Sequence, residues 1–330
     1  MAEATHEDQR DFHPSAPWVN LRLRAHLLRT TREFFDAKGF LEVETPILSA
    51  DTVIDRHLDP FSVEAGPLPG IPERLWLQTS PEFAMKRMLA AGAGSIYQVS
   101  RVFRRGELGP LHNPEFTMIE WYYAGAAWND GLQVLNELSE ALLRRGSAER
   151  ISYAEAFRCH AGVDPHTADP LELAQVARKS GVEIPASLRA DDRDGWLDLL
   201  LVERVQPHLG HDRPAIVYDY PASQAALARV RPGPPAVAER FELYVAGIEL
   251  ANGYHELLDP EILRIRNGAA NAHRQSDGKD RLPEESRLLD AMDAGLPPSV
   301  GVAMGFDRVV MLAAGASCLS EVIAFPMDRA

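Results

Sequence analysis

The sequence predicts an α+β fold in which helices flank an antiparallel sheet. Residues 95–103 and a segment starting at Glu115 have strand character on either side of a loop containing Pro and Gly, so they predict a hairpin. A second hairpin is predicted within residues 241–259, because Asn252-Gly253 tolerates the positive φ of a tight turn. The signatures GxxxxGK[ST] and strand-GxGxxG-helix are absent. A bound nucleotide would therefore lie on an antiparallel sheet.

The composition is that of a globular protein rather than a disordered or membrane protein. Of the 330 residues, 45% are hydrophobic and 25% are charged, and this length allows two domains or one large sheet-centred domain. The formal net charge of −14 disfavours a broad electrostatic contact with nucleic acid, although a local basic cleft is compatible with it.

The cysteines and the N-terminus predict a cytoplasmic protein. Cys159 and Cys318 have neither zinc-site spacing nor a disulfide framework, which fits a reducing compartment. The first twelve residues, MAEATHEDQRDF, are acidic and polar where a signal peptide needs a basic start and an apolar run. No stretch of 18 apolar residues occurs, so we expect no membrane span.

The first predicted helix follows an N-terminal extension of residues 1–20. Leu21, Ala25, Leu28 and Phe35 have helical spacing, and Gly39 stands where a left-handed C-terminal cap belongs. Residues 40–48 then predict an extended segment that stops near Pro46, with a role in the core or in a subunit contact.

A short strand is predicted at LWLQT, residues 75–79, and a helix follows it as far as Gly92. Ser80 supplies a hydroxyl cap, Pro81 fits the first helical position, and Glu82 lies at the positive end of the helix. Glu82 is explained as a helix-dipole residue, unless this strand lies beside the first hairpin.

Residues 147–210 predict a helical insertion without a catalytic signal. Apolar residues at helical spacing within 171–177 and 196–205 are separated by Asp, Pro and Gly. Strand composition returns at residues 215–221, and PGPP at 232–235 marks a loop. The remainder, residues 21–330, is predicted to form one domain around this insertion.

The first hairpin carries a polar face. Phe116, Met118, Glu120 and Tyr122 alternate along the second strand and share one side of it, and Arg104 ends the first strand. A guanidinium binds phosphate, an aromatic face accepts a base, and an inward carboxylate selects an ammonium group. The hairpin therefore indicates recognition of a nucleotide and an amine, with an edge hairpin bearing an ordinary ion pair as the alternative.

The second hairpin carries carboxylates. With a turn at Asn252-Gly253, Glu249 would approach Glu256 across it, and Asn252, Tyr254 and Glu256 would share one face. Two close carboxylates raise each other's pKa unless a cation lies between them, and Mg²⁺ with ATP phosphates is the common biological solution. The alternative is an exposed acidic turn.

Residues 299–315 predict a strand that leads into a helix. Gly301 and Gly305 allow the strand to approach a ligand closely, and Asp307-Arg308 lies where the apolar helix begins. Arg308 is placed to meet a phosphate. The alternative is a solvated arginine in a first helical turn.

Four segments together resemble the motifs of class II aminoacyl-tRNA synthetases of the lysyl type. They are similar to motif 1, motif 2, the lysine-site strands and motif 3, in that order: FLEVETPIL, FRR…HNPEFTMIEWY, GIELANGYHEL and GVAMGFDRVVML. The resemblance extends from Leu21 to Pro326. Only about twenty residues precede the first helix, far fewer than an anticodon-binding barrel needs, so the chain resembles the free-standing elongation factor P lysine ligase family.

This resemblance implies a class II catalytic core, a homodimer joined through motif 1, and ATP with Mg²⁺. The implied reaction activates (R)-β-lysine or lysine as an aminoacyl-adenylate and transfers it to a lysine side chain of elongation factor P, without tRNA. The alternatives are a truncated lysyl-tRNA synthetase that charges tRNA and a catalytically silent paralogue that senses amino acid or nucleotide.

The resemblance also implies individual roles. Arg104 and Arg308 would be catalytic, and Glu249 and Glu256 would hold the metal. The ATP site would comprise Arg104, Arg105, Gly106, His112, Asn113, Phe116, Glu249, Leu250, Gly305 and Arg308. The amino-acid site would comprise Ser80, Pro81, Glu82, Glu120, Tyr122, Asn252, Tyr254, Glu256 and Ala303.

The chain departs from the synthetase pattern at three places. Gly106 replaces the glutamate that reads the adenine amino group, so Glu107 or backbone would have to take over. Ala303 replaces a glycine, and the added methyl would disfavour an α-amino group and suit an amine displaced by one carbon. PASQAALA, residues 221–228, replaces a Glu-x-Ser-Pro pattern, which fits a different acceptor.

Overall fold

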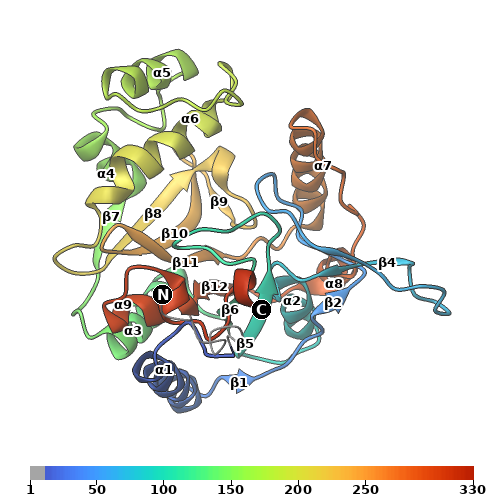
Figure 1. The fold of residues 1–330 in the computed structure, drawn as a ribbon. Helices are drawn as coiled ribbons and strands as arrows, with labels where there is room; N and C mark the ends of the chain where they lie inside the picture. The colour runs from blue at the N-terminus through green and yellow to red at the C-terminus, as the bar shows by residue number, and fades with distance from the viewer. Residues whose placement is uncertain (1–11) are drawn as a thin grey trace, which may run out of the picture.

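A nine-stranded sheet runs through the centre of the structure (Figure 1). The computed structural model describes residues 12–330, so most of the predicted extension 1–20, including the polar N-terminal segment, lies outside the described residues. The strand order is β1-β5-β6-β12-β11-β10-β8-β7, with β9 added beside β10. The pairs from β5 to β8 are antiparallel, whereas β1–β5 and β7–β8 are parallel. The predicted α+β fold is confirmed, with parallel pairing only at the two edges.

The strands of this sheet are β1 (Leu41–Glu42), β5 (Ile96–Phe103), β6 (Glu115–Ala124), β7 (Glu149–Ser152), β8 (Ala215–Pro221), β9 (Val230–Arg231), β10 (Val237–Val245), β11 (Ile248–His255) and β12 (Ser299–Gly305). A small separate sheet has the order β2-β4-β3, formed by β2 (Leu48–Ser49), β3 (Ser62–Glu64) and β4 (Arg74–Leu77). The helices are α1 (Trp18–Ala37), α2 (Glu82–Ala90), α3 (Trp128–Leu143), α4 (Tyr153–His160), α5 (Pro170–Lys179), α6 (Arg193–Leu200), α7 (Pro260–Ser276), α8 (Arg287–Gly295) and α9 (Phe306–Ala314).

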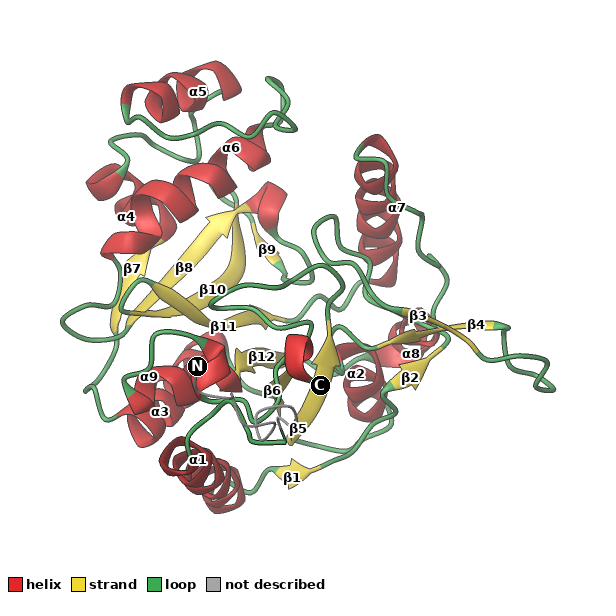
Figure 2. Ribbon diagram, in the orientation of Figure 1, coloured by secondary structure: helices red, strands yellow, loops and turns green. Residues whose placement is uncertain are grey.

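Helices α1, α3 and α9 cover one face of the sheet and enclose its main core (Figure 2). Phe35 of α1 is fully buried, stacks on Tyr97 with ring centroids 4.5 Å apart, and lies 5.4 Å from Trp121. Helix α1 ends at Ala37, and Gly39 has φ +75°, as the predicted left-handed cap requires. Because this face is filled with apolar side chains, polar residues of β6, β11 and β12 can collect on the other face.

The second hairpin forms, but its predicted turn is wrong. Strands β10 and β11 are joined at Ala246 and Gly247, which have φ of +51° and +73°. Asn252-Gly253 lies inside β11 instead. A Cβ at Gly253 would lie 2.4 Å from a ring atom of Phe241, so this glycine is required for packing rather than for turning. The Ala246-Gly247 turn is of the kind that suits a two-residue hairpin.

Residues 147–210 contain helices where 171–177 and 196–205 predicted them, and also α4 and β7, which the prediction did not place. Helices α4, α5 and α6 surround a core of their own that packs on β8 (Figure 1). Strand β7 pairs in parallel with β8 and begins this segment.

The predicted helix after Ser80 begins one residue later than expected, with Pro81 at its N-cap, and ends at Ala90 rather than Gly92. Among residues 12–330, no helix combines the length and apolar character of a membrane span.

Gly210 should be intolerant of a side chain, because it joins the insertion to the β10–β11 turn. Its φ is +73°, a Cβ there would lie 2.3 Å from the Tyr244 carbonyl oxygen, and its own carbonyl accepts a 2.7 Å hydrogen bond from the Ala246 N–H. We expect Gly210→Ala to lower the free energy of unfolding by about 2–4 kcal/mol in urea denaturation. The control Gly181→Ala, at φ +69° with nothing within 4 Å of its Cβ, should lose only about 1 kcal/mol. Equal losses would contradict the clash.

Candidate active site

The register of β6, β12 and β11 collects the predicted amino-acid site on one patch of the sheet. Tyr122 lies opposite Gly301, which lies opposite Tyr254. Ala303 lies opposite Glu120 on one side and Asn252 on the other. These residues line one cavity together with the start of α2: Ser80, Glu82, Glu120, Tyr122, Asn252, Tyr254, Glu256, Gly301, Val302 and Ala303. Every residue predicted for amino-acid binding lines this cavity except Pro81, which is buried at the N-cap of α2.

Three buried carboxylates in this cavity share one buried cation. Glu82, Glu120 and Glu256 are 8%, 2% and 1% exposed, and Lys86 is 2% exposed. The Lys86 ammonium lies 2.5 Å from a Glu82 oxygen and 2.6 Å from a Glu256 oxygen. Among the described residues, Glu120 accepts hydrogen bonds from neutral donors alone, the Ser80 hydroxyl at 2.6 Å and the Tyr122 hydroxyl at 2.7 Å. With all groups ionised, the cluster carries a net charge of −2.

The protonation behaviour of the cluster reflects this missing positive charge. Burial raises the pKa of Glu120 to about 8, and the negative charge of Glu82 adds to the effect. Burial likewise raises the pKa of Glu256 to about 7, against the opposing attraction of Lys86. Burial lowers the pKa of Lys86, but its two carboxylate partners outweigh this and hold the pKa above its ordinary value. A bound ammonium group would supply the positive charge that Glu120 lacks.

Gly301 and Asn252 shape the cavity in different ways. A Cβ at Gly301 would lie 2.1 Å from a Glu256 carboxylate oxygen and 2.4 Å from the Tyr122 ring. This glycine therefore makes room for two side chains of the site, where the sequence predicted room for a ligand. The side-chain oxygen of Asn252 is buried, and no hydrogen-bond donor meets it within residues 12–330, so it is free to accept a bond from a substrate amine.

Arg104 follows the end of β5 and lies beside the start of β6, where its N–H donates to the Pro114 carbonyl at 2.8 Å. Its guanidinium carbon is 5.1 Å from the centroid of the Phe116 ring, and its nearest carboxylate oxygen belongs to Glu107 at 3.9 Å. The Arg104 Nε–H is buried without an acceptor among the described residues. An arginine with an unused donor beside an aromatic ring is suited to an anion and a flat base.

Arg308 joins the loop after β5 to β11. From the first turn of α9, it donates hydrogen bonds to the Leu111 carbonyl at 3.1 Å and the Glu249 carbonyl at 2.9 Å, and its Nη2 lies 2.8 Å from His112 Nε2. Burial lowers the pKa of His112, and the positive charges of Arg308 and Arg104 lower it further. A neutral His112 can therefore accept from Arg308.

Gly305 and Leu250 border this arginine through their backbones. A Cβ at Gly305 would have Arg308 Cδ and the Leu250 carbonyl oxygen as its nearest neighbours, both at 3.9 Å. The Leu250 side chain is buried in the main core, so a ligand on the opposite face would meet only its backbone. The structure thus brings Gly305, Leu250 and Arg308 together.

The loop between β5 and β6 contains the remaining predicted ATP residues. Gly106 has φ +87°, a conformation that glutamate adopts only with strain, which is a physical reason for the departure at this position. Arg105 is exposed, and its N–H donates to the Asp59 carbonyl at 2.7 Å. The Asn113 side chain is already used, because it donates to the Glu115 carbonyl at 2.6 Å and accepts from the Met327 N–H at 3.0 Å.

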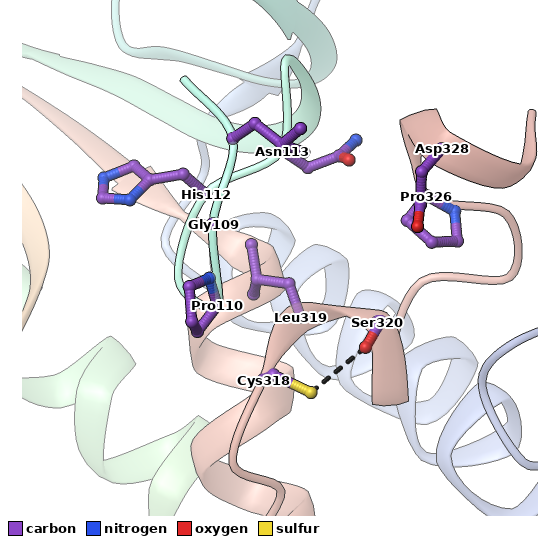
Figure 3. Close-up of a pocket in the computed structure, with 10 residues that line it drawn as sticks. Gly109, Pro110, His112, Asn113, Cys318, Leu319, Ser320, Pro326 and Asp328 are labelled. Carbon is purple, nitrogen blue, oxygen red and sulfur yellow. Dashed lines mark hydrogen bonds between the residues drawn. The ribbon is translucent and has the colours of Figure 1, made fainter. Parts of the chain in front are cut away.

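Asn113 also borders a cavity of about 280 Å³ that lies behind this loop (Figure 3). Its walls are the loop backbone and the C-terminal segment, and Cys318 Sγ lies 3.1 Å from the Ser320 hydroxyl within it. The His112 ring points away from Cys318 and Ser320 in Figure 3. His112 and Asn113 of the predicted ATP site line this cavity, but the buried carboxylates do not. The predicted amino-acid site therefore belongs to the other cavity, which Glu82, Glu120 and Glu256 line.

The predicted approach of Glu249 to Glu256 across a turn is wrong, because both residues follow the true turn, Glu249 within β11 and Glu256 directly after its end. Glu256 is held by Lys86 instead. Burial raises the pKa of Glu249 to about 7, and the charge that raises it most is Glu242 of β10, a residue that the prediction missed. Placing the turn at Ala246-Gly247 would have shown that Glu242 and Asn252 are opposite each other.

Glu249 retains a carboxylate suited to a cation. Its side chain makes no hydrogen bond or ion pair within the described chain, whereas Glu242 accepts from the Tyr220 hydroxyl at 2.6 Å and from Tyr244 and Arg240. No cluster of three or more His, Cys, Asp or Glu residues suited to a metal occurs in residues 12–330. Mg²⁺ commonly takes one or two carboxylates and completes its shell with phosphates and water. Glu249 and Glu242 therefore fit a Mg²⁺ that binds together with a nucleotide, rather than one held by protein ligands alone.

Comparison with known proteins agrees with this geometry. Residues 11–329 match the family described as tRNA synthetases class II (D, K and N). The proteins named "Elongation factor P--(R)-beta-lysine ligase" from Klebsiella pneumoniae (strain 342) and Edwardsiella ictaluri (strain 93-146) are each 47% identical to this chain, over 97% and 98% of it and 98% and 99% of their own lengths. The protein of that name from Vibrio cholerae serotype O1 is 48% identical over 97% of this chain and 99% of its own length.

The sheet and its site thus define a class II synthetase core. Within that class, the chain belongs to the family of elongation factor P–(R)-β-lysine ligases.

Binding of lysine should weaken as the pH falls from about 8 to about 6. Below the raised pKa of Glu120, the free cavity holds a proton that an incoming ammonium group must displace, so binding should release a proton and the affinity should fall by up to about tenfold per pH unit. Calorimetry in buffers of different ionisation enthalpy measures both effects.

Glu120→Gln should weaken binding and reduce this slope, leaving the part that Glu256 contributes through its own raised pKa, whereas Glu107→Gln, outside the cavity, should keep the full slope. A wild-type affinity that is constant over this pH range would show that Glu120 does not titrate with binding.

Proposed function

We propose that this chain is an ATP-dependent ligase that activates (R)-β-lysine or lysine as an aminoacyl-adenylate and transfers it to a lysine side chain of elongation factor P. The observation that carries the proposal is the cluster of three buried carboxylates with one lysine, on the same strand face as Arg104 and Phe116. Its net charge of −2 is matched by a substrate with two ammonium groups. The names of the 47% identical relatives point to the same substrates.

In the first step, a carboxylate oxygen of the amino acid attacks the α-phosphorus of ATP. A new P–O bond forms, the bond to the β-phosphate oxygen breaks, and pyrophosphate leaves. Arg104 would stabilise the negative charge that develops on the phosphoryl oxygens, using the donor that is buried without a partner in the free site. Glu82, Glu120 and Glu256 would hold the ammonium groups so that the carboxylate faces Arg104.

The nucleotide would be held by Phe116 under the base and by Arg308 with His112 near the phosphates. Glu249 would hold Mg²⁺, with Glu242 as the additional carboxylate whose charge acts on it most strongly, and the ion would neutralise phosphate charge when bound. The roles of Arg105, Gly106, Asn113, Leu250 and Gly305 would be limited to backbone or peripheral contacts, because their side chains are absent, exposed, buried in the core or already bonded.

In the second step, the amine of the acceptor lysine attacks the carbonyl carbon of the adenylate. An amide bond forms, the carbonyl-to-phosphate oxygen bond breaks, and AMP leaves as the amine loses its proton.

A homodimer is also part of the proposal. It is supported by exposed apolar residues of the predicted motif 1 segment, namely Leu41, Ile47 and Leu48, which are 55%, 41% and 39% exposed.

The proposed activity is tested by the intact mass of elongation factor P after incubation with this protein, Mg·ATP and each lysine isomer. A gain of one lysyl group supports the proposal. Charging of tRNA at a rate comparable to a full-length synthetase would favour the truncated synthetase, and binding of ATP and lysine without pyrophosphate exchange would favour the sensing paralogue.

Arg104→Ala should depress pyrophosphate exchange far more than it depresses amino-acid binding. The charge that Arg104 meets develops at the transition state, so we expect turnover to fall by about a hundredfold or more, with lysine affinity nearly unchanged. Arg101→Ala, an exposed arginine of β5, the strand that ends just before Arg104, is the matched control and should change neither. Parallel losses in exchange and binding would contradict this role of Arg104.

Ala303→Gly should shift substrate preference toward α-lysine. Ala303 lies between Glu120 and Asn252 across the strands, so removing its methyl opens space where an α-amino group would lie. The ratio of kcat/KM for α-lysine to that for (R)-β-lysine should rise by about tenfold or more in pyrophosphate exchange. Ala251→Gly, whose parent side chain faces the core, should leave the ratio unchanged. An unaltered ratio in Ala303→Gly would remove the steric argument.

A further inference from the structure

A buried ion pair connects α1 to the back of the proposed nucleotide site. Arg24 of α1 binds a carboxylate oxygen of Asp307 through one guanidinium nitrogen and donates through another to the Thr117 hydroxyl at 2.6 Å. The second Asp307 oxygen accepts the Thr117 backbone N–H at 2.9 Å. Three elements, α1, β6 and the start of α9, therefore meet at one charge pair.

This pair lies directly behind both walls of the nucleotide site. Successive residues of a strand face opposite sides, so Thr117 on the rear face follows Phe116 on the front. Asp307 and Arg308 are neighbours in the first turn of α9, and Arg308 reaches the Leu111 and Glu249 carbonyls on the front. A shift of Asp307 relative to Thr117 would change the spacing between Phe116 and Arg308.

The surroundings hold the pair in one geometry. Asp307 and Thr117 are 2% and 6% exposed, the Arg24 side chain is 13% exposed, and the fully buried Phe306 ring lies 5.1 Å from the guanidinium carbon. Arg24 contributes a bidentate bridge that a point charge cannot reproduce, because one group binds the carboxylate and the hydroxyl together. Its loss would leave the Asp307 charge buried with only the Thr117 N–H as a donor.

We propose that Arg24 is a positioning residue for ATP: through Asp307 and Thr117 it sets the distance between Phe116 and Arg308. The inference rests on the proposed function, since it assumes that these two residues bind the nucleotide. Arg24 itself lies on the rear face of the sheet and touches neither ATP nor the amino acid.

The test is steady-state pyrophosphate exchange with Arg24→Met, Arg24→Lys and Thr117→Val, with thermal unfolding measured alongside. Arg24→Met should raise the KM for ATP by about tenfold or more, the scale expected for a lost charged hydrogen-bond pair, and leave the KM for lysine within about threefold. Arg24→Lys keeps the charge but loses the bidentate bridge, so it should be intermediate. Thr117→Val removes only the hydroxyl and should give a smaller rise. Arg22→Met, an exposed arginine of the same helix, is the matched control and should behave as wild type.

The outcomes separate the inference from the function on which it rests. If the wild-type protein exchanges pyrophosphate and a folded Arg24→Met keeps the wild-type KM for ATP, or loses ATP and lysine affinity equally, the positioning role is wrong and the ligase proposal stands. If Arg24→Met does not fold, Arg24→Lys and Thr117→Val decide in the same way. Absence of exchange by the wild type with either lysine isomer would instead overturn the proposed function.

Discussion

The bond network of Lys86 is the interaction on which the site depends. Three carboxylates cannot remain buried side by side without a cation, since each would repel the others and lose its hydration. Lys86 satisfies Glu82 and Glu256 from the second turn of α2 and leaves Glu120 to neutral donors. With all four groups ionised, the buried cavity therefore has one cation for three carboxylates, which is a deficit of positive charge. In the proposed function, that deficit gives the cavity a preference for an amine.

The sheet also sets the distance between the proposed amino-acid site and the proposed nucleotide site. Phe116 and Glu120 are four residues apart on β6, which separates them by about 13 Å along an extended strand. An amino acid anchored at Glu120 and a base on Phe116 would leave the carboxylate and the α-phosphate between them, beside Arg104. Rigid strands supply this spacing, and helices α1, α3 and α9 support them from behind with an apolar core.

Local patterns predicted much of this, and tertiary contacts account for what they missed. Alternation along 115–124, the cap at Gly39 and the strand at 215–221 follow from neighbouring residues, and the structure agrees with each. The turn of the second hairpin failed because Gly253 is required by Phe241, a contact that appears only when β10 and β11 pair.

Lys86, Glu242 and Arg24 were missed for the same reason. Each acquires its role from a partner on another element, and the Arg24–Asp307 pair spans 283 positions of the chain. The amino-acid residues, by contrast, were found by resemblance to a known motif set, and the register of three strands explains why residues so far apart in the sequence share one cavity.

The most direct test of the central claim is a crystal structure with a non-hydrolysable lysyl-adenylate analogue. The account predicts the ammonium groups among Glu82, Glu120 and Glu256, the base against Phe116, and the phosphate mimic on Arg104. An analogue bound in the cavity beside Cys318, or oriented with its base among the carboxylates, would contradict it.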